Sequence, residues 1–306
     1  MRPPAQVLPL IEWGAAQLRE AGIDAHNGLG QGTLDAFDEA AWLVLWRLGL
    51  PLDSDLQATG GHEVSPQQLH DVQSLLHRRI TERIPTAYLT RQAWLCGVPF
   101  YVDERAIIPR SLIAELIADG TLDAWLHEDT RQVLDLCTGN GSLAVLAALT
   151  YPQVQVQAAD ISEQALAVAR INVDQHGLSQ RIELLESDGL TRCSGPYDLI
   201  LCNPPYVDAA RMAGLPPEFR AEPALALAGG EDGMDFIGPL LARAARCMRP
   251  QAVLVLEIGN ERENFERAFA GLEPVWLPTS AGDEQVLLLS SEQLLQHALP
   301  RAGTRA

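Results

Sequence analysis

From about residue 131 onward, runs of strand-forming residues alternate with segments of helical spacing, and this alternation constrains the fold most. Apolar runs predict strands at residues 132–136, 155–160, 182–187 and 197–202, and helical spacing predicts helices at 142–149 and 162–175. Strands joined through helices run parallel, because right-handed crossovers return the chain to the same edge of the sheet. The pattern predicts an α/β sheet with helices on both faces.

The rest of this region continues the same domain, which we place at residues 129–306. Helices are predicted at 235–248 and 261–270, and strands at 252–258, 275–277 and 285–289. No internal repeat or low-complexity segment interrupts it.

The first 94 residues have helical spacing and no convincing strand, with predicted helices at 8–21, 34–48 and 66–83. Residues 95–128 follow as a linker with extended pieces at 97–102 and 106–108 and then a helical stretch. The linker is rich in aromatic and β-branched residues, so we expect a hairpin packed beside the α/β domain rather than a free tether. The chain is therefore divided into a small helical domain, a hairpin linker and an α/β domain.

Charge restricts the chemistry and the partners. The chain has 40 acidic residues and 22 basic ones, all of which are arginine, for a net charge of −18. Without lysine, Schiff-base chemistry is excluded. An acidic surface repels phosphate backbones and attracts basic partners, so we expect a basic protein partner and no direct binding of free nucleic acid.

The cysteines and histidines show no spacing that predicts a metal site, and the five cysteines are read as reduced. No apolar run is long enough to span a bilayer, and the N-terminus lacks a signal segment, so we expect a cytoplasmic protein with no membrane partner.

The first predicted strand of the α/β domain ends in a glycine turn, from Asp135 through Cys137, Thr138, Gly139 and Asn140 to Gly141. A strand, a tight turn and a helix start bring backbone N–H groups against a ligand at the carboxyl edge of the sheet. The spacing also fits a dinucleotide fingerprint and a purely structural turn.

Acidic residues follow the next two strands. Asp160 ends the second strand, where a carboxylate would hold the ribose hydroxyls of a nucleoside cofactor. Asp188 follows the third strand and would face an adenine ring, although either acid also suits a plain strand end. Residues 257–260 end the fifth strand and are read as a site wall or as simple turn chemistry.

The fourth strand runs directly into Asn203-Pro204-Pro205-Tyr206. Pro204 forces Asn203 into an extended conformation, and the two proline rings stiffen the turn. The side-chain carbonyl of Asn203 and the backbone carbonyl of Pro204 can then accept the two N–H bonds of a planar amide, while Tyr206 packs on its plane. This motif predicts a catalytic clamp for an NH2 group that receives a methyl group.

These two motifs resemble those of the HemK-type protein-glutamine N-methyltransferases, and the resemblance extends over nearly the whole chain. It implies a Rossmann-like, seven-stranded class I methyltransferase sheet with a helical N-terminal domain that recognises the substrate. It also implies S-adenosyl-L-methionine as cofactor. The residues carried over to the cofactor are Asp135, Cys137, Thr138, Gly139, Asn140, Gly141, Asp160, Asp188 and Asn203, and those carried over to the glutamine are Asn203, Pro204, Pro205 and Tyr206.

Two branches of that family differ in their substrate. Residues 84–94 and 108–111 are similar to the branch that acts on the large-subunit ribosomal protein L3 (uL3), rather than to the release-factor branch. Cys137 departs from the glycine that the release-factor branch usually has. The resemblance implies methylation of a uL3 glutamine, on the free protein or within an assembling subunit.

Other hypotheses remain open at this point. A release-factor methyltransferase shares all the chemistry, and an adenine-amino methyltransferase of nucleic acid would use the same clamp. A nicotinamide oxidoreductase leaves the double proline unexplained, and an inert adaptor leaves the intact clamp unexplained.

Overall fold

The computed structural model describes residues 3–24, 28–29 and 32–298. The ends of the two predicted domains, residues 1–2 and 299–306, therefore lie outside the described residues. The chain divides into two compact units. The helical unit comprises Met1–Ala93, Val102–Glu104 and Leu215–Glu222, and the sheet unit comprises Trp94–Tyr101, Arg105–Gly214 and Pro223–Ala306.

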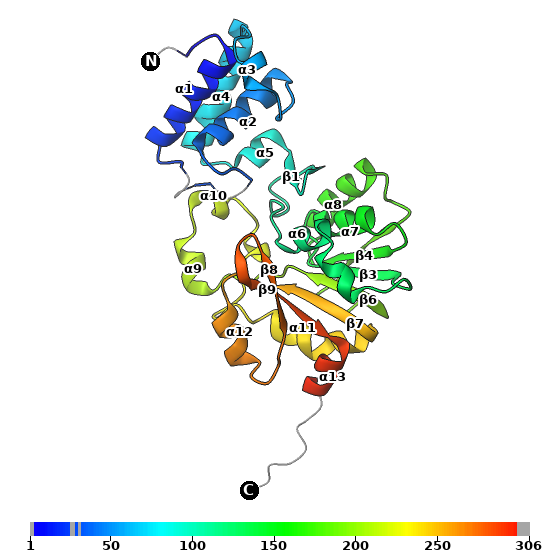
Figure 1. The fold of residues 1–306 in the computed structure, drawn as a ribbon. Helices are drawn as coiled ribbons and strands as arrows, with labels where there is room; N and C mark the ends of the chain where they lie inside the picture. Colours follow the sequence, from blue (N-terminus) through cyan, green and yellow to red (C-terminus); the bar gives the residue numbers. More distant parts are fainter. Residues whose placement is uncertain (1–2, 25–27, 30–31, 299–306) are drawn as a thin grey trace. The chain divides into compact units, whose positions relative to one another are not determined.

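The helical unit is built from short helices around an apolar core (Figure 1). Its helices are α1 (Val7–Glu20), α2 (Ala36–Leu48), α3 (Leu56–Thr59), α4 (Pro66–Thr81), α5 (Thr86–Thr90) and α10 (Pro217–Arg220). A Cβ added to Gly14 of α1 would lie 3.3 Å from Ala40 Cβ of α2 and 3.2 Å from Leu76 Cδ1 of α4. The small residue therefore allows these helices to approach closely.

Capping residues set where α2 and α4 begin. The Asp35 carboxylate accepts hydrogen bonds from the backbone N–H groups of Phe37 and Asp38 at the start of α2. Ser65 and Gln68 form a reciprocal capping box at the start of α4. Each cap satisfies N–H groups that have no partner within the helix and contributes about 1 kcal/mol.

The sheet unit contains a seven-stranded sheet in the order β5-β4-β3-β6-β7-β9-β8. Its strands are β3 (Gln132–Leu136), β4 (Gln155–Asp160), β5 (Ile182–Glu186), β6 (Tyr197–Cys202), β7 (Met248–Glu257), β8 (Val275–Thr279) and β9 (Gly282–Ser290). The pairs among the first five strands of this order are parallel, and β9 is antiparallel to both neighbours. The predicted fold class is confirmed.

Alternate strand residues supply two cores, one on each face of the sheet. Val133 and Leu199 pack in the first core, and their neighbours Leu134 and Ile200 pack in the second. This alternation follows from the period of two residues in a strand. The first face carries α6 (Ile113–Ala118), α7 (Ser142–Thr150) and α8 (Glu163–Gln175), and the second carries α11 (Ile237–Ala244), α12 (Arg262–Ala268) and α13 (Ser291–Ala298).

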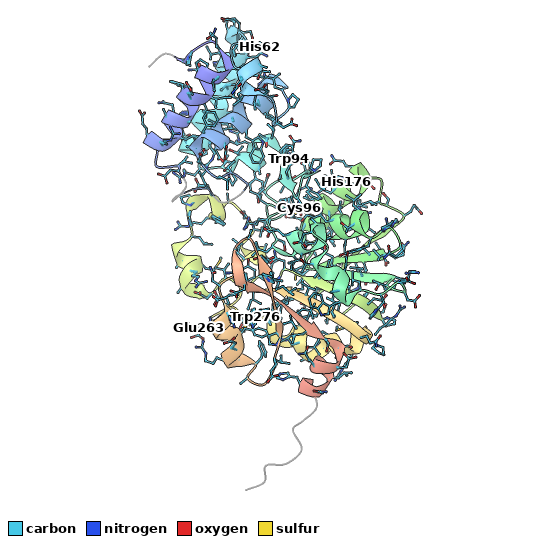
Figure 2. All side chains as sticks on the ribbon, viewed as in Figure 1. His62, Trp94, Cys96, His176, Glu263 and Trp276 are labelled. Carbon is cyan, nitrogen blue, oxygen red and sulfur yellow. The ribbon has the colours of Figure 1, made fainter. Side chains whose placement is uncertain are left out.

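A two-stranded hairpin of β1 (Ala93–Leu95) and β2 (Val98–Phe100) precedes the sheet. Its two turn residues have positive φ, as the tightest hairpin turns require. His176, which Figure 2 labels, directly follows α8. Its Nε2 forms a hydrogen bond with the Pro99 carbonyl at 2.8 Å. The Asn172 side chain bonds both the N–H and the carbonyl of Tyr101, so the hairpin is fastened to α8.

Some elements differ from the predictions. Residues 106–108 form no strand, and Ala106 packs against Ala165 and Val168 of α8. The predicted helix at 235–248 ends earlier, as α11 followed by the 3-10 turn η3 (Ala245–Cys247). The helical stretch predicted for the linker contains α6 and the 3-10 turn η1 (Thr121–Trp125), whereas the pattern did not indicate α9 (Ala209–Gly214), α10 or η2 (Ala224–Ala226). Among the described helices, none is both long and apolar enough to cross a membrane.

Candidate active site

The sheet order reverses direction between β3 and β6, and crevices at such a reversal bind ligands in open α/β sheets. Asp160 is the last residue of β4, and Cys137, Asn203 and Ile258 directly follow β3, β6 and β7, which are parallel to it. Since the carboxyl ends of parallel strands meet at one edge, the topology brings the glycine turn and the Asn203–Tyr206 segment to the same edge.

The glycine turn uses three residues with left-handed backbone. Cys137, Gly139 and Gly141 have φ of 61°, 55° and 82°. A Cβ on Gly139 would lie 3.3 Å from Ile107 Cγ2, and a Cβ on Gly141 would lie 3.1 Å from Ala169 Cβ. Gly141 therefore permits α7 to begin close to α8, and Gly139 allows Ile107 to lie close to the turn.

Asp135 lies behind this turn and is fully buried. Its Oδ2 accepts hydrogen bonds from Thr138 Oγ1 at 2.5 Å and from the Ala144 N–H at 2.9 Å. Burial raises the pKa of Asp135 to about 7, even though these two hydrogen bonds act in the opposite direction. Asp135 therefore ties the turn to the first residues of α7.

Two buried polar atoms in this region, Asp135 Oδ1 and Asn140 Nδ2, have no hydrogen-bond partner among the described residues. The other polar groups of Asn140 are engaged: its Oδ1 accepts from the Ser142 N–H, and its backbone carbonyl accepts from Asn172 Nδ2 at 2.8 Å. One buried acceptor and one buried donor of the turn thus have no hydrogen-bond partner among the described residues, although buried polar groups normally have one.

Asp160 fastens the turn to the end of β4. Its Oδ2 accepts from the Gly139 N–H at 2.8 Å and its Oδ1 from the Ser162 N–H at 2.9 Å. Burial raises the pKa of this carboxyl in spite of both bonds. Asp188, beyond the end of β5, is exposed.

Tyr206 is anchored by a buried carboxylate. Its hydroxyl donates to Glu257 Oε1 at 3.2 Å, while Glu257 Oε2 accepts from Ser111 Oγ at 2.6 Å and from the Leu112 N–H at 2.9 Å. Burial raises the pKa of Glu257. Burial and the charge of Glu257 raise the pKa of Tyr206, so the phenol stays protonated and continues to donate.

Glycines make room for Tyr206 on several sides. A Cβ on Gly259, whose φ is 54°, would lie 2.5 Å from Tyr206 Cε2. A Cβ on Gly229 would lie 2.7 Å from the Tyr206 Cα, and one on Gly233 would lie 2.5 Å from the Tyr206 carbonyl oxygen. The ring and the backbone of Tyr206 therefore occupy a closely packed position.

Several relatives of this chain share one name. "Ribosomal protein uL3 glutamine methyltransferase" of Burkholderia pseudomallei is 50% identical over 88% of this chain and 91% of its own. Proteins of the same name from Bordetella pertussis and Neisseria gonorrhoeae are 48% and 44% identical, over 93% and 94% of this chain and 95% and 94% of their own. The chain belongs to this family.

Two further comparisons agree on the fold. Residues 119–218 match the family described as Methyltransferase small domain. A solved structure titled as the hMettl16 catalytic domain in complex with MAT2A 3′UTR hairpin 6 is similar with a TM-score of 0.50 and 16% identity, over 74% of this chain and 81% of that one. The predicted family and its ribosomal-protein branch are confirmed, and the sheet unit is that of a methyltransferase.

The predicted site residues of this methyltransferase fall into two groups, the glycine turn with Asp160 and the Asn203–Tyr206 segment. The turn residues and Asp160 are joined by direct hydrogen bonds, whereas Asp188 makes its hydrogen bonds through its backbone carbonyl, to Thr191. Asn203 and Tyr206 are partly buried, and Pro204 between them is buried.

Sequence reasoning missed the support of the clamp. Glu257 was read only as part of a site wall or a turn, and Ser111 only as part of a branch motif. Both are buried polar residues joined by one hydrogen bond across 146 residues of chain. A glutamate that closes an otherwise apolar strand was the one available signal, since a buried carboxylate needs partners.

Proposed function

We propose that this protein transfers a methyl group from S-adenosyl-L-methionine to the side-chain amide nitrogen of a glutamine in ribosomal protein uL3. The observation that carries the proposal is the Asn203–Tyr206 segment at the end of β6, at the same edge as the glycine turn, with the Tyr206 hydroxyl held by Glu257. The names of the relatives support the glutamine and the ribosomal protein.

The residues of the turn fit the cofactor. S-adenosylmethionine supplies an electrophilic methyl group on a sulfonium and carries an amino acid group with both charges. The unpartnered acceptor Asp135 Oδ1 and donor Asn140 Nδ2 suit such a group. We assign the turn from Asp135 to Gly141 to the cofactor, Asp160 to its ribose and Asp188 to its adenine.

The chain's own residues do the positioning. The side-chain carbonyl of Asn203 and the backbone carbonyl of Pro204 accept the two N–H bonds of the substrate amide, and the Tyr206 ring packs against its plane. The nitrogen forms the new N–C bond as the S–C bond breaks, and its proton then leaves to water. Because an amide nitrogen is a poor nucleophile, orientation and exclusion of water supply most of the acceleration, about 7–11 kcal/mol at most.

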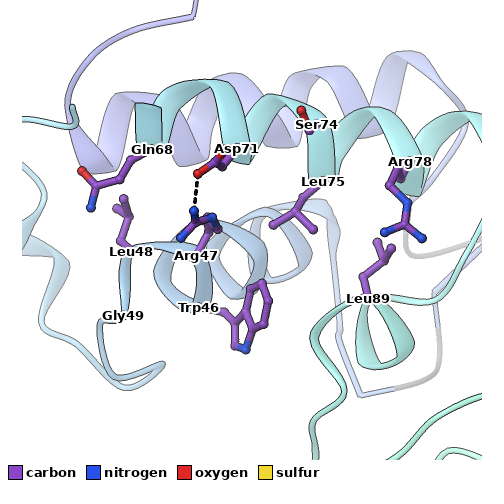
Figure 3. A pocket seen from close by; sticks show the side chains of 10 residues that line it. All are labelled: Trp46, Arg47, Leu48, Gly49, Gln68, Asp71, Ser74, Leu75, Arg78 and Leu89. Carbon is purple, nitrogen blue, oxygen red and sulfur yellow. Dashed lines mark hydrogen bonds and ion pairs between the residues drawn. The ribbon is translucent and has the colours of Figure 1, made fainter. Parts of the chain in front are cut away.

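We assign recognition of the protein substrate to the helical unit. Its surface has an open groove of about 770 Å³ between the end of α2, the middle of α4 and Leu89 (Figure 3). Trp46, Leu48 and Leu75 contribute apolar surface there, and Arg47 pairs with Asp71 beside them. A polypeptide segment with apolar side chains fits this lining, and the net charge of −18 favours a basic protein as the partner.

The test is methyl transfer from labelled S-adenosylmethionine to unmethylated uL3, a release factor and an assembling large subunit in parallel, with mass spectrometry of the modified peptide. Label on a glutamine of uL3, free or within the subunit, is the expected result. Label on the release factor alone would overturn the proposed partner, and label on RNA would overturn the proposed class of substrate.

A further inference from the structure

We propose that residues 208–227 form an excursion that couples the helical unit to the glutamine clamp, with Glu218, Arg79 and Arg83 as positioning residues. This inference rests on the function proposed above, because it assigns those residues to the reaction of the same clamp. None of the three residues belongs to either predicted half of the site.

Both ends of the excursion lie beside Tyr206. Val207, the next residue, donates its N–H to the Leu227 carbonyl at 2.8 Å, and its own carbonyl accepts from the Gly229 N–H at 2.8 Å. Gly229 also lies directly against the Tyr206 backbone. The two ends of the excursion are thus closed by hydrogen bonds beside the clamp, and a shift of either end moves the backbone of Tyr206.

The tip of the excursion belongs to the helical unit. Residues Leu215–Glu222, which include α10, lie in that unit, whereas the chain on both sides of them lies in the sheet unit. Glu218 of α10 has a fully buried side chain. Its Oε1 accepts from Arg79 Nη1 at 2.8 Å, and Arg83 bridges both of its oxygens, with Nε 2.6 Å from Oε1 and Nη2 3.1 Å from Oε2.

The partners of Glu218 are fixed in the core of the helical unit. The Arg79 side chain is 1% exposed and donates from Nε to Glu39 Oε1 at 2.5 Å and from Nη2 to the Gly28 carbonyl at 2.7 Å. Glu39 of α2 also accepts from Thr86 Oγ1 at 2.8 Å. One carboxylate from the excursion therefore completes a network that already joins α2, α4 and α5.

A network of this kind specifies position more than it adds stability. Burying charges costs free energy that their pairing largely offsets, so replacing such pairs by apolar residues is often neutral, whereas the paired arrangement sets register. Burial opposes ionisation of Glu218, but the hydrogen bonds from Arg83 and Arg79 outweigh it and lower the pKa of the carboxyl. The charged pair thus fixes α10 against the core of the helical unit.

The experiment compares Glu218→Ala with Glu218→Gln, which keeps an acceptor oxygen, and with His77→Ala. His77 lies two residues before Arg79 on α4 but is exposed and does not line the groove, so its variant controls for a general effect on that helix. For each full-length protein, kcat and KM are measured on uL3, the Kd for S-adenosylmethionine is measured by calorimetry, and hydrogen exchange is followed at the Val207 and Gly229 amides without substrate.

For Glu218→Ala we expect a fall in kcat of about 10- to 100-fold, because displacement of a reacting group by about 1 Å has effects of this size. The Kd for S-adenosylmethionine is unchanged, KM changes less than kcat, and the two amides lose protection. Glu218→Gln restores most of the activity, and His77→Ala behaves as wild type.

A Glu218→Ala protein with wild-type kcat, or with wild-type protection at both amides, would overturn the coupling. If Glu218→Ala unfolds the helical unit, Arg83→Ala is tested instead, because this variant leaves the Arg79–Glu218 pair intact. We expect Arg83→Ala to lower kcat and the protection of both amides in the same way, but by less. The absence of these changes would overturn the inference. If the wild-type enzyme does not methylate uL3, the proposed function is refuted. Hydrogen exchange at the Val207 and Gly229 amides is measured without substrate, so it tests the coupling independently of that function.

Discussion

The glycine turn and the Tyr206 clamp lie at one sheet edge but are built in opposite ways. Turn hydrogen bonds join residues 3, 9 and 21 positions apart, from Thr138 and Ala144 to Asp135 and from Gly139 to Asp160. The clamp depends on bonds across 51 and 146 positions, from Tyr206 and Ser111 to Glu257. Local sequence forms the turn, whereas the assembled sheet supports the clamp. Substitutions in the turn should therefore affect cofactor binding, and substitutions around the clamp should affect turnover, independently of each other.

The first prediction concerns the clamp. Asn203→Ala removes an acceptor for the substrate amide, and we expect kcat to fall by about 10²–10³, the effect of removing one polar group aimed at a reacting centre. Thermal unfolding should match the wild-type protein. Normal turnover by this variant would contradict the assignment of Asn203.

The second prediction concerns the buried carboxyl of the turn. The pKa of Asp135 is about 7 in the folded protein against 3.8 for an ordinary aspartate, so the folded state binds more protons between these values. Stability should therefore fall as pH rises from about 4 to about 7, and Asp135→Asn should lack this part of the fall.

Denaturant unfolding at several pH values measures the effect. As pH rises from about 4 to about 7, the unfolding free energy of the wild type should fall by on the order of 2–4 kcal/mol relative to that of Asp135→Asn. Asp188→Asn, at an exposed carboxyl of the same sheet unit, is the control. A constant difference between wild type and Asp135→Asn would show that the folded-state pKa is ordinary.

The third prediction uses two glycines with matched backbone. Gly139 in the turn and Gly259 beside the clamp have φ of 55° and 54°, so alanine costs each about 1 kcal/mol of backbone strain. Their neighbouring side chains differ, because a Cβ at position 139 would contact Ile107, whereas a Cβ at position 259 would contact the Tyr206 ring.

We therefore expect Gly139→Ala to weaken S-adenosylmethionine binding about tenfold, and Gly259→Ala to lower kcat on the protein substrate about tenfold with cofactor binding unchanged. Calorimetry and steady-state rates with the two variants separate these effects. Equal loss of both properties in both variants would mean that the halves of the site are not independent.

The smallest effect is expected for Tyr206→Phe. The ring remains against Gly259, and only the hydrogen bond to Glu257 is lost, while Ser111 and Leu112 still satisfy the other carboxylate oxygen. A lost hydrogen bond of about 1 kcal/mol corresponds to about a fivefold fall in kcat. Tyr206→Ala is the matched comparison, and a similar fall in both would show that the hydroxyl, rather than the ring, is what the clamp needs.

Much of the fold was predictable because its signals are local. The bounds of β3, β4 and β6 follow directly from apolar runs that end in glycine, aspartate or asparagine, and α2 and α4 begin at capping residues. By contrast, the segment from α9 to η2 is rich in proline and alanine and has no apolar periodicity, so its short helices left no pattern to read.

The sequence by itself predicted the order of strands and helices along the chain, the tight glycine turn and the stiff Asn203–Tyr206 segment, because each depends on neighbouring residues and their backbone preferences. Only the tertiary structure decided that Glu257 and Ser111 would hold Tyr206 and that Glu218 would join Arg79 in the helical unit. Those contacts bring together residues 51 to 146 positions apart, and pairing between buried polar groups leaves no periodic trace in the chain.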